Sequence, residues 1–245
     1  MPEGLAEILR AGRATTAGAP LPVAPAVLAG IAIAAVPAMM AGIEIGHLTA
    51  DRLSEAAALL ARAFHEDPGH VHLYPDATAR ARALPHQFSA ACREAMGLSH
   101  VRTASVGGRL VGIAVWLPPG AYPISIWRQL RLVPDVARMC LASPRSFGKV
   151  VRFAAAAHMA HPAQPYWYLQ VIGVEPALQG RGIGTRLVGP VLDMADRAGQ
   201  PCYLETDTAP NVRWYRGLGF EVRAAGVEFI AGGPPYWTML RPPPR

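Results

Sequence analysis

The sequence predicts a mixed α/β domain, and two stretches of its C-terminal half support this prediction most strongly. Residues 166–174 combine aromatic and β-branched side chains, which is typical of a buried strand. Apolar residues between positions 187 and 195 then recur at helical spacing. Between the two lies the stretch Gln179-Gly180-Arg181-Gly182-Ile183-Gly184, so a glycine-rich turn joins a strand to a helix.

This turn predicts a binding site for a phosphate group. Backbone N–H groups in the first turn of a helix have no partner within the helix, and the helix dipole favours an anion there. A P-loop needs a lysine beside the turn, whereas the only lysine of the chain is Lys149. A dinucleotide fingerprint needs a third glycine where the chain has Thr185. Neither of these nucleotide motifs is therefore present.

The first half of the chain predicts one strand and two helices. The strand is expected at 43–48, followed by a helix that ends at Pro68. A second helix is expected over 77–96, with a kink or a break at Pro85.

A β-hairpin is expected after these helices. Strands at 100–105 and 109–117 flank the dipeptide Gly107-Gly108, which is typical of a tight turn. Gly112 within the second strand indicates a bulge.

Residues 118–165 are expected to be a basic helical insertion between two strands of the sheet. Helical segments are predicted near 124–132 and 146–160. Its basic residues are Arg128, Arg131, Arg138, Arg145, Lys149 and Arg152.

Residues 1–42 differ in composition from the rest of the chain. From 14 to 43 there is no charged residue, and alanine, valine, isoleucine and proline predominate. We expect a disordered extension, or a start codon assigned too early, with Met39 or Met40 as the true start. The alternative is a membrane anchor or an export signal, because the length suffices for a span, although four prolines argue against it. The folded domain is expected over 43–245.

The composition narrows the class of protein. A chain of 245 residues with 51% hydrophobic content suits one domain with a sizeable core. Three widely spaced cysteines fit neither a disulfide framework nor a zinc site, so we expect no metal and a reducing cytoplasm. The net charge of +6 comes without a nucleic-acid-binding motif, so no nucleic-acid partner is expected.

The glycine-rich turn fits the pattern [Gln/Arg]-x-x-Gly-x-[Gly/Ala] through Gln179, Gly182 and Gly184. It resembles the acyl-CoA pyrophosphate loop of the GCN5-related N-acetyltransferase (GNAT) superfamily. Further on, Asn211, Tyr215 and Gly219-Phe220 resemble the superfamily's Asn-x-x-x-Tyr-x-x-x-Gly-Phe ending.

The resemblance covers the C-terminal third of the chain most closely. Residues 166–223 in particular resemble the puromycin N-acetyltransferase branch. The resemblance implies a twisted, mostly antiparallel sheet flanked by helices, which splays between the strands at 166–174 and 202–207. Acetyl-CoA, the implied co-substrate, would lie in the splay.

The resemblance also implies which residues bind the donor. The backbone of Ile172, Gly173 and Val174 would pair with the pantetheine arm, and Asn211 would hydrogen-bond to it. The pyrophosphate would lie on the loop residues Gln179, Gly180, Arg181, Gly182, Ile183, Gly184 and Thr185.

The implied reaction is transfer of an acetyl group to a primary amine of a small molecule, by direct attack in a ternary complex. An antibiotic or an aminonucleoside is a possible acceptor. Tyr215 is the candidate general acid, because a phenol is a fair match to a thiolate leaving group.

Glu205 is the first candidate for the general base. Strand alternation places it on the same face as Tyr203 and Asp207, at a strand end beside the cofactor. Asp207, Glu66, Asp67 and a water are the other candidates. Glu66 and Asp67 follow the first helix, in the region that shapes the acceptor pocket in this superfamily.

Several alternatives stay open at this point. The acceptor could be the amine of a protein or peptide, and the chain could be an acyl-CoA-binding module without catalysis. A homodimer is possible. The basic insertion is either a solvated helical face or a lid over the acceptor site that also contacts the CoA phosphate.

Overall fold

The computed structural model describes residues 42–98 and 100–244. The extension expected at 1–42 and the alternative anchor at 14–43 lie almost wholly outside the described residues. Among the described residues, no helix combines the length and the apolar character needed to cross a membrane.

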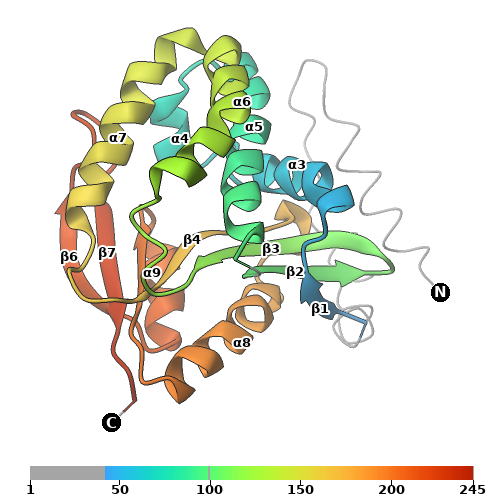
Figure 1. Cartoon of the computed structure of the whole chain (residues 1–245), viewed down its shortest axis with the longest axis vertical. Helices are drawn as coiled ribbons and strands as arrows, with labels where there is room; N and C mark the ends of the chain where they lie inside the picture. The colour runs from blue at the N-terminus through green and yellow to red at the C-terminus, as the bar shows by residue number, and fades with distance from the viewer. Residues whose placement is uncertain (1–41, 99, 245) are drawn as a thin grey trace, which may run out of the picture.

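A seven-stranded sheet with helices on both faces forms the body of the molecule (Figure 1). The strand order is β1-β2-β3-β4-β5-β7-β6. The strands are β1 Glu44–His47, β2 Val101–Val106, β3 Arg109–Leu117, β4 Trp167–Val174, β5 Cys202–Thr206, β6 Glu221–Val227 and β7 Tyr236–Arg241. The helices are α3 Leu53–Ala63, α4 Pro68–Leu73, α5 Ala77–Met96, α6 Ile126–Ala142, α7 Phe147–Ala160, α8 Ile183–Arg197 and α9 Ala209–Gly217. Short 3-10 turns lie at η1 Ala50–Arg52, η2 Pro144–Ser146 and η3 Pro176–Leu178.

The sheet opens between β4 and β5. Every other pair of neighbouring strands is antiparallel, whereas β4 and β5 run parallel. They pair only at Trp167↔Cys202 and Tyr168↔Tyr203, and beyond these positions they diverge. The predicted mixed fold, with a mostly antiparallel sheet that splays at this point, is therefore confirmed.

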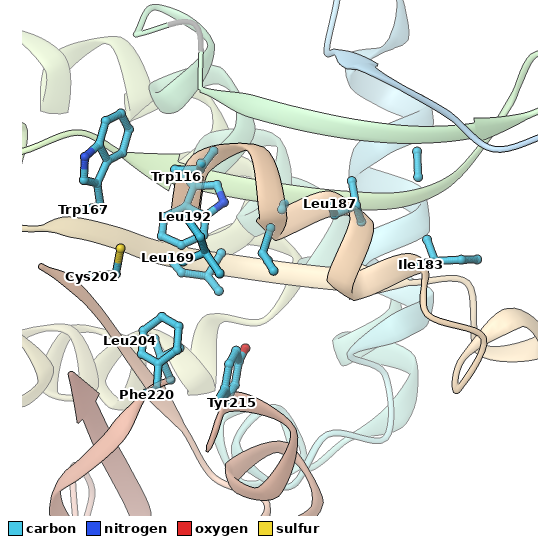
Figure 2. Packing of buried hydrophobic residues seen from close by; sticks show 14 of the residues in the cluster. Trp116, Trp167, Leu169, Ile183, Leu187, Leu192, Cys202, Leu204, Tyr215 and Phe220 are labelled. Atoms are coloured by element: carbon cyan, nitrogen blue, oxygen red, sulfur yellow. The ribbon is translucent and has the colours of Figure 1, made fainter. Parts of the chain in front are cut away.

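Two apolar cores lie on opposite faces of the sheet. One joins α8 and α9 to the sheet through residues such as Leu187, Leu204 and Phe220 (Figure 2). The other joins α3 and α5 to the opposite face. The helices approach closely: a Cβ atom on Gly112 of β3 would lie 2.8 Å from Leu187, and one on Gly173 of β4 would lie 2.7 Å from Leu60 of α3. These glycines let both layers pack directly on the backbone of the sheet.

The predicted hairpin is confirmed in detail. Gly107 and Gly108 have φ angles of 55° and 77°, the left-handed region that a tight primed turn requires. The register shifts from Ala104↔Gly112 to Ser105↔Leu110, so Val111 is the extra residue of a bulge next to Gly112.

Proline positions account for the errors in the helix predictions. The first helix does not end at Pro68: α3 ends at Ala63, and Pro68 instead begins α4. Proline is favoured there because the first N–H of a helix needs no partner, and the side chain of Asp67 caps the helix. A break at Pro85 is also wrong, because α5 continues through it.

The insertion consists of α6, which packs beside α5, and α7, which runs on toward β6 and β7 (Figure 1). Helix α6 is longer than the predicted segment and contains Pro134. Arg128 of α6 contacts the buried carboxylate of Glu94 in α5, and Nε of Arg93 lies 2.9 Å from Asp135 of α6. Helix α6 exposes several large apolar side chains, among them Ile126, Trp127, Leu130, Val133 and Leu141.

Candidate functional site

The glycine loop has the geometry expected of an anion site. Gly180 and Gly182 have φ angles of 73° and 77°, and Gly182 is the N-cap of α8. Residues other than glycine rarely adopt this backbone conformation, so the shape of the loop depends on these two glycines. Nε2 of Gln179 donates to the carbonyl oxygen of Val174 at 3.1 Å and ties the loop to the end of β4.

The remaining loop residues differ in exposure. Thr185 is exposed and Arg181 is half-buried, so both side chains reach the surface. Ile183 points into the core, which leaves its backbone alone to face a ligand.

One edge of β4 is left without a strand partner. Ile172, Gly173 and Val174 pair with β3 on one side, at Ala114, Ile113 and Gly112. On the other side β5 pairs only up to Tyr168. Edge N–H and C=O groups of this kind can accept an extended ligand as an added strand. The three residues predicted to bind the pantetheine arm thus lie at the opening of the sheet.

Helix α9 packs against the first turn of α8. Nε1 of Trp214 donates to Oγ1 of Thr185 at 3.2 Å, and a Cβ atom on Gly184 would lie 3.1 Å from the Trp214 ring. Asn211, one turn earlier in α9, is exposed. The contact places the middle of α9 beside the first turn of α8.

Tyr215 is a core residue as well as a candidate acid. It is 5% exposed and packs 5.7 Å from the ring of Phe220 and 4.7 Å from that of Trp214, measured between centroids. Figure 2 shows its hydroxyl end directed toward the side on which β4 runs. Burial raises the pKa of Tyr215 well above its ordinary value, so the phenol stays protonated at neutral pH.

Asp67 and Asp207, far apart in the sequence, meet where the start of α4 contacts the end of β5. Oδ2 of Asp207 accepts from the N–H of Gly69 at 2.8 Å. Oδ1 of Asp67 accepts from the N–H of His70 at 3.1 Å and lies 2.6 Å from Nδ1 of the same histidine. The hydroxyl of Tyr236 closes the group, because a Cβ atom on Gly69 would lie 2.0 Å from it.

The two carboxyl groups have opposite pKa shifts. Burial, followed by the charge of Asp67, raises the pKa of Asp207 to about 6. Burial also tends to raise the pKa of Asp67. The hydrogen bonds of Asp67 and the charge of His70 outweigh burial, so the pKa of Asp67 is lowered. Glu66 does not join this group: its side chain is 80% exposed and lies near His65 and Arg80.

Glu205 lies two residues beyond the last β4–β5 pair and is surrounded by aromatic rings. Its side chain is 10% exposed, and its Oε1 lies 3.1 Å from Nε2 of His161. Burial, followed by the charge of Glu205, raises the pKa of both Tyr168 and Tyr203 far above the ordinary value.

The sequence did not identify two residues of this region, His161 and Tyr236. His161 follows α7 at the end of the insertion, and Tyr236 begins β7. Neither belongs to a local motif, so only the folded chain brings them to Glu205 and Asp207. Within the described residues, no group of His, Cys, Asp and Glu could hold a metal ion.

Comparisons with known proteins agree with this geometry. The sequence model of the Acetyltransferase (GNAT) family matches residues 59–220. N-alpha-acetyltransferase RimI of Mycobacterium tuberculosis is 39% identical over 111 residues, which cover 41% of this chain and 69% of that protein. An uncharacterized protein of Mycobacterium leprae is 32% identical over 82 residues, covering 34% of this chain but only 23% of that protein.

Solved structures share the fold at low sequence identity. A histone acetyltransferase HPA2 and related acetyltransferase from Corynebacterium glutamicum superimposes with a TM-score of 0.62 at 21% identity, covering 83% of this chain and 98% of that one. Arylalkylamine N-acetyltransferase 2 from Aedes aegypti gives a TM-score of 0.57 at 12% identity, covering 82% and 98%.

Proposed function

Because the chain belongs to the acetyltransferase (GNAT) family, we propose that it transfers an acetyl group from acetyl-CoA to a primary amine of a small molecule. The observation that carries the proposal is the opening between β4 and β5, which lies beside a glycine loop at the start of α8. A thioester in this opening would meet an amine that arrives from the α3–α5 face of the sheet.

Donor binding would use the backbone more than side chains. The open edge of Ile172, Gly173 and Val174 would align the pantetheine arm, and the loop amides from Gln179 to Thr185 would hold the pyrophosphate. Arg181 adds a positive charge on the loop. Asn211 is exposed one helical turn before Trp214, which contacts Thr185, and would hydrogen-bond to the arm.

Tyr215 is the group proposed to protonate the departing thiolate. It is a neutral phenol in an apolar setting, and an oxygen acid held in this state can give a proton to sulfur as the C–S bond breaks. Its burial keeps water from competing with it.

Glu205 is the group proposed to take a proton from the incoming ammonium. Its carboxylate is only 10% exposed, and Oε1 lies 3.1 Å from Nε2 of His161, so a proton accepted there has a neighbouring group to which it can move. The oxygens of Asp207 are already engaged by Gly69 and Asp67. The Asp67–Asp207 pair is proposed instead to attract the cationic amine.

A second acceptor class has one observation in its favour. The relative RimI, an N-alpha-acetyltransferase, is 39% identical over 111 residues. A peptide amine is therefore the alternative acceptor. Membership of the puromycin N-acetyltransferase branch and a homodimer stay predictions.

The test is a screen of the purified protein with acetyl-CoA and a panel of acceptors, following release of free thiol. The panel holds aminonucleosides, other antibiotic amines, polyamines and peptides with free N-termini. Binding of CoA without thiol release from any acceptor would favour a binding module over an enzyme.

Tyr215→Phe tests the proposed acid within that assay. Turnover should fall by about 100-fold, within the usual contribution of general acid catalysis, while the affinity for CoA changes little. The unchanged thermal stability of a folded variant serves as the control. An unchanged rate across the pH range would refute the role.

A further inference from the structure

His161 joins two parts of the molecule through its two ring nitrogens. Nε2 lies 3.1 Å from Oε1 of Glu205, and Nδ1 lies 2.5 Å from the hydroxyl oxygen of Tyr166. The side chains of His161 and Glu205 are only 5% and 10% exposed. The ring of Tyr122 stacks on the imidazole at 4.0 Å with an interplanar angle of 13°, which fixes the plane of the ring.

A cavity of about 380 Å³, partly open to solvent, lies against this histidine. His161 and Tyr166 line it, together with the turn before α6 and residues 162–165. Glu205 is not among the lining residues, so His161 stands between the buried carboxylate and the cavity. The lining contains no Asp, Glu, Lys or Arg that would trap a proton.

The proposed reaction leaves one proton to be removed in each turnover. A primary amine with an ordinary pKa near 10 arrives at neutral pH as an ammonium, and it leaves as a neutral amide. Tyr215 gives CoA its thiol proton, and the second of the two nitrogen protons restores the phenol of Tyr215. The first is left on Glu205, whose side chain is only 10% exposed.

We propose that His161 carries this proton from Glu205 to the cavity. The inference rests on the proposed function, because it concerns the proton that acetyl transfer releases. The carboxylic acid form of Glu205 passes its proton to Nε2 of His161, and the proton on Nδ1 moves to the oxygen of Tyr166. The hydroxyl proton of Tyr166 moves at the same time to a water or buffer base in the cavity.

This sequence of transfers balances. Glu205 returns to a carboxylate, His161 to a neutral imidazole and Tyr166 to a neutral phenol, with one proton delivered to solvent and no change of oxidation state. The imidazole regains its starting tautomer by rotating about its Cβ–Cγ bond within the plane that Tyr122 fixes. In the rotated position Nε2 releases its proton to water in the cavity and Nδ1 takes one up, so the net transfer of one proton to solvent is unchanged.

The other groups around the pair do not offer a competing route. Burial, with the negative charge of Glu205, raises the pKa of Tyr122 to about 12 and keeps Tyr166, Tyr168, Tyr203 and Tyr236 neutral as well. Arg223 faces Tyr203, and His158 lies 3.2 Å from the hydroxyl of Tyr122. Tyr168 and Tyr203 also contact Glu205, but of these groups His161 is the one that links Glu205 to the cavity through its two ring nitrogens.

The experiment is chemical rescue of His161→Ala, with saturating acetyl-CoA and an active amine. We expect kcat to fall about 10-fold to 100-fold, in line with the loss of one proton-transfer group, and KM for both substrates to stay within a few-fold. Imidazole, which can enter the open cavity, should restore kcat in proportion to its concentration. Pyrazole, a ring of the same size that is not basic near neutral pH, should not.

Two further variants separate proton transfer from structure. His161→Gln keeps a polar side chain of similar size but cannot relay a proton, so kcat should fall in the same way. His158→Ala removes a histidine that lines the same cavity without contacting Glu205, so its activity should remain that of the wild type and should not respond to imidazole.

The outcomes distinguish this inference from the function on which it rests. Thiol release by the wild type, with no rescue of His161→Ala or with equal rescue by imidazole and pyrazole, would overturn the proton route alone. An unchanged kcat in His161→Gln would overturn it too. No thiol release by the wild type with any amine would overturn both.

Discussion

Replacing Asp207 with Asn is expected to stabilise the folded protein at neutral pH. The pKa of Asp207 rises from its ordinary value of 3.8 to about 6 in the folded state, so ionising this carboxyl group costs folding energy. Between these two values the folded protein binds more protons than the unfolded one, and stability falls as the pH rises. At about 1.4 kcal/mol per pH unit the full cost is at most about 3 kcal/mol.

The measurable gain is smaller than this upper limit. Asp207 is half-buried and shares its proton with Asp67, so we expect a gain of about 1–2 kcal/mol at pH 8. Asn keeps the shape, and its Oδ1 can still accept from Gly69 while its amide donates to Asp67. At pH 4 the gain should vanish, because the native carboxyl group is then protonated.

Asp67→Asn is the matched control and should have the opposite sign. The pKa of Asp67 is lowered, so this carboxylate contributes stability that is present above its unfolded pKa and is lost as the pH falls through the folded pKa. Asn still caps α4, but it loses the charge that attracts His70, so we expect a loss of about 1 kcal/mol at pH 8. Urea unfolding followed by tryptophan fluorescence at pH 8 and pH 4 measures all three proteins. A shift in the same direction for both variants at pH 8 would refute the reasoning.

Two other predictions concern glycines. Gly173→Ala should destabilise the protein by about 1–3 kcal/mol in urea unfolding, because the added methyl group would lie 2.7 Å from Leu60; an unchanged midpoint would mean that α3 shifts freely. Gly182→Ala should cost about 1–2 kcal/mol through its φ angle of 77° and should weaken CoA binding in calorimetry. Gly189→Ala, inside α8 with open space around it, should instead stabilise by up to about 1 kcal/mol and leave CoA binding unchanged, so equal effects of the two substitutions would contradict the argument.

The fold was predictable wherever the signal is local. The hairpin at Gly107-Gly108 and the helix over 77–96 each follow from a pattern within a few residues, and both agree with the structure. Pro68 was misassigned because proline both ends a helix and begins one. The choice depends on the cap that precedes it, and here Asp67 makes it a beginning.

In the candidate site, too, the parts that depend on a local pattern could be predicted and the parts that depend on the fold could not. The proposed donor site consists of backbone amides and could be predicted from Gln179, Gly182 and Gly184, because their spacing indicates the turn. The proposed acceptor side depends on side chains from four separate elements. Asp67 and Asp207 were named as separate candidates, but their pairing, and the place of His161 beside Glu205, required the fold.

The insertion, α6 and α7, connects helix α5 to the cavity that His161 lines. Arg128 contacts Glu94 of α5 and also donates to the carbonyl oxygen of Ala121 at 2.6 Å, which fixes the turn before α6. Tyr122 directly follows Ala121, and its ring stacks on His161 at the other end of the insertion. The charge of Arg128 thus serves a fixed contact and not a solvated face. Both ends of the insertion meet at the cavity that His161 lines. Its anchoring to α5 therefore sets the position of the groups that we propose to move the proton.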